Sequence, residues 1–270
     1  METPIVFGEF ENLVGVVNDP EARQSDVAVL MLTPGMLHHT GPYRLHVLMA
    51  RRLAKQGIAS LRYDLSGIGE SLAVGEPGSS LERASREAQY AMDRMQADYG
   101  IKKFILFGLC SGADDGMYAA LKDDRIVGLA LLDGCGYRTM RYHVHRALGH
   151  YLPRLFRLDK WKRLVRRGPT EETAGSLQMG VDIREYPEQE VAEFQISELA
   201  DRGVQMRFIY TGGVAGYFNY GAQFFDMFPS LRGRKEVSTT FFPDMDHLAM
   251  LREDRVKLLN DLTGWISTCA

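Results

Sequence analysis

The chain has 270 residues, of which 45% are hydrophobic and 25% are charged, and its formal net charge is −3. These proportions are typical of a soluble globular protein whose core is large enough to be stable without disulfides. The slightly acidic balance argues against a nucleic-acid partner. The sequence has no apolar run of about 18 residues and no basic, apolar leader, and its three cysteines do not suggest a disulfide framework. We therefore expect a cytoplasmic protein.

Strand-like and helix-like segments follow one another along the chain. A hairpin is expected over residues 5–17, and a continuous apolar run then predicts a buried strand over Val27–Thr33. The later segments, in chain order, are a helix over 43–55, a strand over 58–63, a helix over 80–99, a strand over 103–107, a helix ending at 121, strands over 126–132, 205–211 and 237–242, and a helix over 256–266. This alternation is typical of right-handed crossovers, and it predicts a mostly parallel sheet flanked by helices.

One interval interrupts the alternation. Residues 134–203 separate two expected strands by far more chain than a crossover connection needs. We therefore expect a core of residues 1–133 and 204–270, with 134–203 inserted as a helical lid. Residues 138–167 are rich in arginine and lysine, whereas 171–201 are acidic. This pattern allows three readings: the two halves pair, the basic half docks an acidic carrier protein or coenzyme A, or it contacts a membrane surface.

The expected strand over 103–107 runs directly into Gly108-Leu109-Cys110-Ser111-Gly112, and a helix follows. This strand–turn–helix context is the one in which a Gly-x-nucleophile-x-Gly motif presents its central residue. The turn is tight, so the residues two before and two after the nucleophile must be small. Glycines flank Cys110 in this way, whereas Ser111 as the nucleophile would bring Leu109 to one of these positions. We expect Cys110 to be the nucleophile, and the alternative is an inert cysteine beside a structural turn.

The partners of this nucleophile follow it in the chain. His247 is expected to be the base, because it follows the last strand and is the only histidine after residue 150. The loop after the strand over 205–211, a usual place for the acid, contains no carboxylate through residue 220. Asp133, at the end of the preceding strand, is the preferred acid, and Asn219 and Asp226 are the alternatives.

The oxyanion hole should combine the Ser111 backbone N–H with an N–H from the loop after Val27–Thr33. In that loop Gly35 allows the backbone to approach closely, and Met36 or Leu37 would supply the amide.

Two more side chains are expected to line or support the substrate site, namely His38 and Asn219. His38 and His39 do not by themselves reach the ligand count of a metal site, so no metal and no other cofactor is expected. The stretch Arg62–Ser71 is interpreted as a structural loop that Asp64 ties down.

Together these residues resemble the α/β-hydrolase superfamily over nearly the whole chain, and within it the serine-aminopeptidase-like branch. Hydrolases that accompany exosortase and exopolysaccharide gene clusters are similar in three segments, which are matched here by Gly108–Ala113, Arg62–Ser71 and Phe218-Asn219-Tyr220. The cysteine in the turn also resembles that of dienelactone hydrolases, but those carry an aspartate after the penultimate strand and this chain does not. The resemblance implies an α/β-hydrolase fold.

These observations predict a hydrolase or acyltransferase that acts on an ester or thioester through Cys110, with His247 as base. The expected partner is a small acyl substrate, either free or linked to a carrier protein or coenzyme A. The missing carboxylate after Thr211 leaves a second hypothesis open, in which the chain is a non-catalytic hydrolase fold used for binding or scaffolding.

Overall fold

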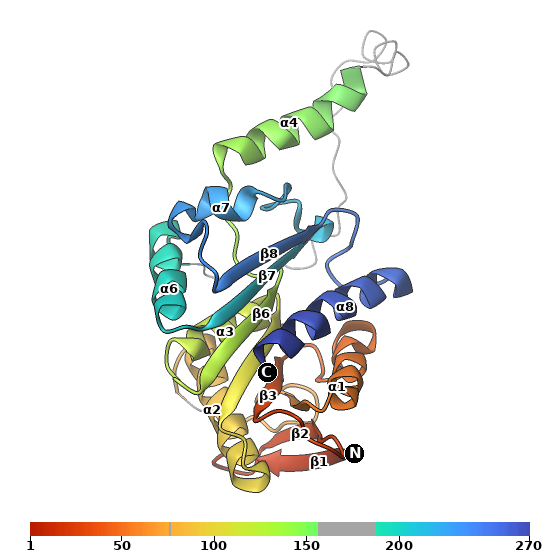
Figure 1. Cartoon of the computed structure of the whole chain (residues 1–270), viewed down its shortest axis with the longest axis vertical. Coiled ribbons are helices and arrows are strands. Elements are labelled where there is room, and N and C mark those ends of the chain that lie inside the picture. The colour runs from red at the N-terminus through yellow and green to blue at the C-terminus, as the bar shows by residue number, and fades with distance from the viewer. Residues whose placement is uncertain (76, 156–186) are drawn as a thin grey trace.

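The computed structural model describes residues 1–75, 77–155 and 187–270, and in the helix over 140–155 it describes side chains up to Leu148. Eight strands form one sheet (Figure 1). They are β1 (Glu2–Phe7), β2 (Leu13–Asn18), β3 (Val27–Leu32), β4 (Ala59–Tyr63), β5 (Lys103–Leu109), β6 (Ile126–Leu132), β7 (Gln205–Thr211) and β8 (Val237–Phe242). Their order is β1-β2-β4-β3-β5-β6-β7-β8. The pairs β1–β2 and β2–β4 are antiparallel and the others are parallel, which confirms the mostly parallel sheet.

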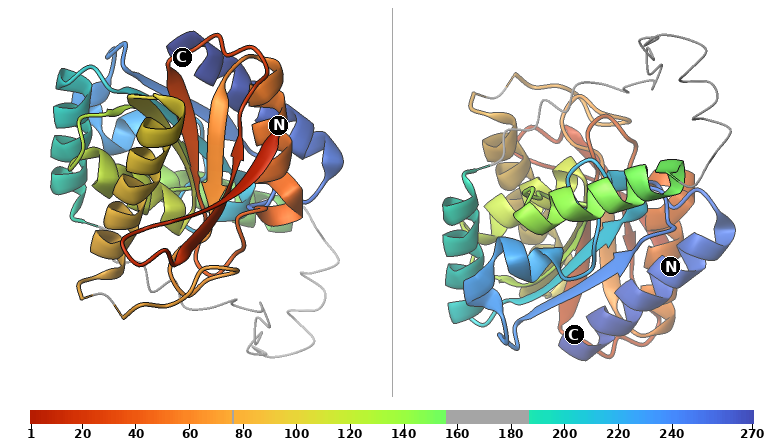
Figure 2. Two further views of the ribbon diagram at one scale, coloured as in Figure 1. Left: turned by 90° about the horizontal axis from the view of Figure 1, so that it is seen from below. Right: turned by 90° about the horizontal axis from the view of Figure 1, so that it is seen from above.

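Helices cover both faces of the sheet, as the two outer layers in Figure 2 show. One face packs against α1 (Leu45–Lys55) and α8 (Arg252–Cys269), and the other against α2 (Ser80–Tyr99), α3 (Ser111–Ala120) and α6 (Gln189–Asp201). Successive side chains of a strand point to opposite faces. In β5, Ile105 and Phe107 therefore join the core under α1 and α8, while Phe104 and Leu106 join the other core. Burial on both faces explains why these strands are continuous apolar runs.

The remaining helical elements are short, except for α4. They are η1 (Pro42–Arg44), α4 (Met140–Leu155), η2 (Gly212–Val214), α7 (Gln223–Met227) and η3 (Pro229–Leu231). In the part of the chain that the structure describes, no helix has the length and apolar character needed to cross a membrane.

The two helices between β6 and β7 have different surroundings. Helix α4 stands away from the sheet at the top of Figure 1, and its residues Met140, Val144 and Leu148 are exposed. Helix α6, by contrast, buries Ile196 and Leu199 in the core. The sequence assigned all of 134–203 to the lid, but α6 is a core helix whose apolar residues recur at helical spacing. Residues 156–186, which hold six of the ten basic residues of 138–167 and the first part of the acidic half, lie outside the described residues.

The first turns of α4 are attached to the segment that follows β7. The Tyr142 hydroxyl donates to Gly216 O at 2.7 Å, and Arg141 forms an ion pair with Asp226 at 2.9 Å. Arg138 donates to Gly216 O at 2.9 Å. Among the described residues, two of the basic side chains of the lid are therefore engaged by the core and not by the acidic half of the lid.

A pair of leucine substitutions tests whether α6 belongs to the core and α4 does not. Leu199→Ala should lower the free energy of unfolding by about 2–5 kcal/mol, because the Leu199 side chain is fully buried in α6. Leu148→Ala, in the same interval of the sequence but 52% exposed on α4, should change it by less than about 0.5 kcal/mol. Urea unfolding followed by circular dichroism measures both values. Similar losses in the two variants would contradict the assignment of α6 to the core.

Candidate active site

The elbow, residues 108–112, joins β5 to α3. Cys110 stands at its turn with a φ of 56° and a ψ of −122°. A positive φ is unfavourable for a residue with a side chain, so the surrounding structure must hold this conformation. The Cys110 N–H donates to Leu132 O at 2.8 Å, which ties the turn to the end of β6. The Cys110 side chain is only half-buried, so it remains accessible.

Two glycines make this turn possible. A Cβ atom on Gly108 would lie 2.1 Å from Gly112 O, and a Cβ atom on Gly112 would lie 2.9 Å from Leu32 O. Both distances are well below the usual separation of non-bonded heavy atoms, so larger residues do not fit. The small residues therefore flank Cys110 and not Ser111, in the register that the sequence predicted.

The structure brings Cys110, His247 and Asp133 together from three loops at the ends of β5, β8 and β6. The His247 Nδ1 atom lies 2.8 Å from Asp133 Oδ2, and the Cys110 side chain is close enough to the imidazole to contribute to its raised pKa. Asp133 is fully buried and also accepts from Thr211, whose N–H and hydroxyl each donate at 2.7 Å. With three donors on its two oxygens, the Asp133 carboxylate is fixed in place.

The charge state of His247 follows from these contacts. Burial opposes the charged form, but the hydrogen bonds to Asp133 and Cys110 outweigh it and raise the pKa of His247 to about 9. At neutral pH the imidazole is therefore an imidazolium cation. A cation at this position stabilises negative charge that develops next to it during a reaction.

The loop after β7 carries glycine where related folds often carry the acid. A Cβ atom on Gly212 would lie 1.9 Å from Pro243 O, and a Cβ atom on Gly213 would lie 2.2 Å from His247 N. The Gly213 N–H also donates to Met245 O at 3.1 Å. The glycines thus let the His247 loop lie directly against the end of β7, and the carboxylate that contacts His247 comes from the end of β6.

The two alternative partners of the imidazole are engaged elsewhere. The Asn219 side chain donates to Tyr142 O at 3.1 Å, and Asp226 accepts from Tyr220 at 2.8 Å. In residues 1–75, 77–155 and 187–270, neither side chain has a hydrogen bond to His247. Asn219 therefore supports α4 and does not orient the imidazole.

The loop after β3 lies against the elbow. The Gly35 N–H donates to the Ser111 hydroxyl at 2.7 Å, a contact that the sequence did not predict. The Leu37 N–H already donates to Pro34 O at 3.1 Å, which removes it as a candidate for the oxyanion hole. Within the described ranges the N–H groups of Met36 and Ser111 have no acceptor. They are the two donors that remain for an oxyanion.

Asp64 connects the same loop to the loop after β4. Its buried carboxylate accepts from His39 Nδ1 at 2.8 Å and from the Glu70 N–H at 3.1 Å. Burial alone would raise the pKa of Asp64, but the hydrogen bonds from His39 and Glu70 hold it below its ordinary value. The Ser71 hydroxyl donates to Asp64 O at 2.7 Å. These bonds fit the expected role of Asp64 as the residue that ties down its loop.

Solved structures share the fold over almost the whole chain. A putative α/β hydrolase of unknown function from Agrobacterium tumefaciens has a TM-score of 0.59 at 14% identity, with coverage of 98% of this chain and 94% of that chain. A Pyrococcus furiosus esterase has a TM-score of 0.59 at 13% identity, covering 100% and 90%. A proline iminopeptidase from Mycobacterium smegmatis has a TM-score of 0.55 at 16% identity, covering 99% of each chain. These similarities confirm the α/β-hydrolase fold.

The sequence also matches a family model. The model of the serine aminopeptidase S33 family matches residues 24–182, which is more than half of the chain. The chain therefore belongs to this family of α/β-hydrolases. No curated protein matches the sequence significantly.

The hydrogen bond from the Gly35 N–H to the Ser111 hydroxyl holds the loop that carries Met36 against the elbow, and removal of the hydroxyl tests this positioning role. Ser111→Ala should lower kcat for an activated ester about fivefold, the effect of losing one hydrogen bond of about 1 kcal/mol. KM should change little, because an oxyanion hole acts mainly on the transition state. Ser230→Ala removes a hydrogen bond from η3 to Glu193 on α6 and should leave both constants unchanged. A loss that falls on KM alone would contradict the positioning role of Ser111.

Proposed function

We propose that this chain cleaves esters or thioesters, or transfers their acyl groups, through a covalent thioester on Cys110. One observation carries the proposal: the Cys110 thiol, at a strained turn, adjoins an imidazole whose Nδ1 atom is held by a buried carboxylate. A nucleophile, a base and a group that orients the base are the parts that covalent acyl transfer needs.

The reaction would run in two halves. The Cys110 thiolate attacks the acyl carbon, and the carbonyl electron pair moves to the oxygen, which the N–H groups of Ser111 and Met36 stabilise. The intermediate then expels the alcohol or thiol, which takes a proton from the His247 imidazolium. In the second half the neutral imidazole takes a proton from water or from an acceptor that attacks the thioester. Collapse returns the thiolate and releases the acid or the new ester.

The cysteine favours esters and thioesters over peptides. When the Cys110 thiolate attacks a thioester, the attacking and the departing groups are both thiolates, and neither is a much poorer leaving group than the other. When it attacks a peptide, the departing amide nitrogen must be protonated as it leaves. The family is described by a serine peptidase activity, and the esterase and the iminopeptidase show that the fold serves both ester and peptide substrates. In this chain the residue between the two glycines of the elbow is Cys110.

Two finer assignments belong to the proposal. The segments Gly108–Ala113 and Arg62–Ser71 support placing the chain near the hydrolases of exosortase and exopolysaccharide gene clusters, whose substrate class they do not specify. The basic residues of the lid favour an acyl substrate on an anionic carrier, such as coenzyme A or a carrier protein. Arg146 is an exposed cation on α4.

The main alternative is a non-catalytic protein that uses the fold for binding. The argument for this alternative is the missing carboxylate after β7. The contact between Asp133, at the end of β6, and His247 weakens that argument. The experiment below separates the two functions.

Substitution of the proposed nucleophile tests the function directly. Cys110→Ala should abolish turnover of ester and acyl-thioester substrates, whereas Cys135→Ala, which changes another half-buried cysteine, should retain it. His247→Ala should lower the rate by about 10²–10⁴-fold or more. Rapid-quench mass spectrometry should find an acyl adduct on Cys110 of the wild type. Iodoacetamide that labels all three cysteines at similar rates, together with no turnover on any substrate, would favour the binding protein.

The pH dependence of kcat/KM tests whether His247 is held as a cation beside Asp133. The raised pKa of His247 means that the imidazolium is present below about pH 9 and is lost as the pH rises through that value. The kcat/KM for an uncharged ester should therefore fall with an apparent pKa of about 9. Asp133→Asn should shift this fall in kcat/KM to lower pH, because the Asp133 carboxylate stabilises the imidazolium. Asp226→Asn should leave the fall at the same pH. A kcat/KM that rises through pH 9 in the wild type would contradict a role for the His247 cation.

A further inference from the structure

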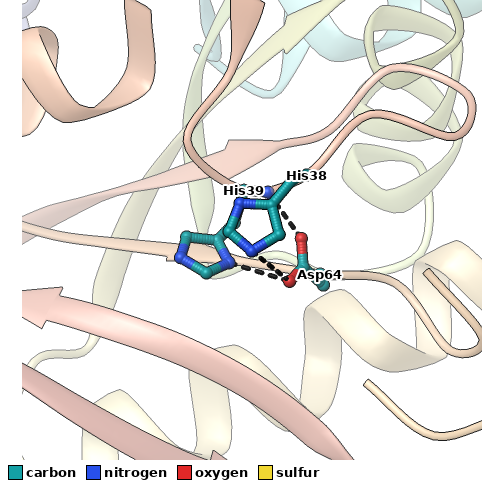
Figure 3. A group of neighbouring side chains, drawn as sticks. All are labelled: His38, His39 and Asp64. Carbon is teal, nitrogen blue, oxygen red and sulfur yellow. Dashed lines mark hydrogen bonds and ion pairs between the residues drawn. The ribbon is translucent and has the colours of Figure 1, made fainter. Parts of the chain in front are cut away.

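Three side chains with metal-ligating atoms meet where the oxyanion loop, residues 34–41, lies against the loop after β4. They are His38, His39 and Asp64, and their ligand atoms all lie within 4.8 Å of one another (Figure 3). The sequence offered only the two adjacent histidines as candidates. The fold adds Asp64, which is 25 positions after His39 in the chain and directly follows the neighbouring strand β4.

The spacing of these atoms suits a small tetrahedral ion. Zn²⁺ with bonds of about 2.0–2.1 Å holds its ligand atoms about 3.4 Å apart. His38 Nε2 lies 3.4 Å from Asp64 Oδ2, and His39 Nδ1 lies 2.8 Å from the same oxygen. A small outward movement of the His39 ring would bring its distance from Asp64 Oδ2 to the same value, and the two histidine nitrogens lie within 4.8 Å of each other. Two imidazole nitrogens and one carboxylate select zinc-type ions over Mg²⁺ and Ca²⁺, which prefer oxygen ligands alone.

The surroundings hold the three groups in position. The His39 and Glu70 N–H groups donate to the Asp64 carboxylate, so its orientation is set by backbone from two loops. His38 Nδ1 accepts from the Thr40 N–H at 3.3 Å and lies 3.4 Å from the Thr40 hydroxyl, which fixes the ring with Nε2 near Asp64. A metal on Nε2 would move the ring proton to Nδ1, where the Thr40 hydroxyl would accept it in place of the bond from the Thr40 N–H. The His38 side chain is 38% exposed, which gives an ion and a fourth, water ligand access from solvent.

We propose that His38, His39 and Asp64 form a binding site for a zinc-type divalent ion that links the oxyanion loop to the loop after β4. Binding would replace the hydrogen bond between His39 and Asp64 with two metal bonds, and the ring proton of His39 would move from Nδ1 to Nε2. The site is separate from Cys110 and His247, and it does not depend on the proposed function.

Metal binding by the untagged chain tests the proposal. All variants should carry Cys110→Ala, because a thiol beside an imidazole also binds zinc. Zn²⁺ titrated against a chromogenic chelator should show one bound equivalent, and Co²⁺ should give the visible absorption of a tetrahedral site. Addition of His38→Ala should weaken Zn²⁺ binding at least tenfold, since loss of even a supporting group costs about 10–100-fold. It should also abolish the Co²⁺ band.

His143→Ala is the matched control, because it removes an exposed histidine of α4 and should leave both signals unchanged. His38 is partly exposed, so His38→Ala is expected to fold, and circular dichroism of the variant checks this. Fewer than about 0.2 equivalents of bound Zn²⁺ in the Cys110→Ala chain, measured by the same competition, would overturn the proposal. Equal affinity with and without His38→Ala would overturn it as well.

Discussion

The buried Asp133 carboxylate is the group on which the candidate site depends. A carboxylate without solvent is stable only when donors surround it. Thr211 supplies two donors from the end of β7, and His247 supplies the third from the loop after β8. The same bonds that stabilise the buried charge therefore orient the imidazole toward Cys110. Loss of the Thr211 hydroxyl would leave Asp133 with fewer donors and the imidazole less firmly held.

Backbone conformation supports this arrangement at two adjacent strand ends. Cys110 and Asp133 both have positive φ values, 56° and 51°, although neither is glycine. Each is held by one more hydrogen bond of the sheet, from Cys110 N–H to Leu132 O and from Asp133 N–H to Ile209 O, both at 2.8 Å. The parallel ladder thus continues one residue past each strand and turns both side chains out of the sheet. Such strain is typical of functional sites.

Local patterns explain what the sequence could predict. Six expected strands lie within two residues of their predicted bounds, and most of these are buried apolar runs, whereas the hairpin expected from residue 5 begins at Glu2. The register of the elbow was also predictable, since only glycine fits at 108 and 112. The core position of α6, the Thr211 bonds and the bond from Gly35 to Ser111 were not predicted. Each depends on which strands become neighbours, and a local pattern does not contain that information.

The oxyanion loop is attached to the elbow beside Cys110 and to the buried Asp64 carboxylate. At its start Gly35 is bound to Ser111 of the elbow, and near its end His39 is bound to Asp64. Met36, with its free N–H, lies between these two attachments. A loop held at both ends has little freedom, so a change at Asp64 reaches Met36 through only a few backbone bonds. An ion on His38, His39 and Asp64 would tighten the second attachment, and it would therefore act on the oxyanion hole without touching Cys110 or His247.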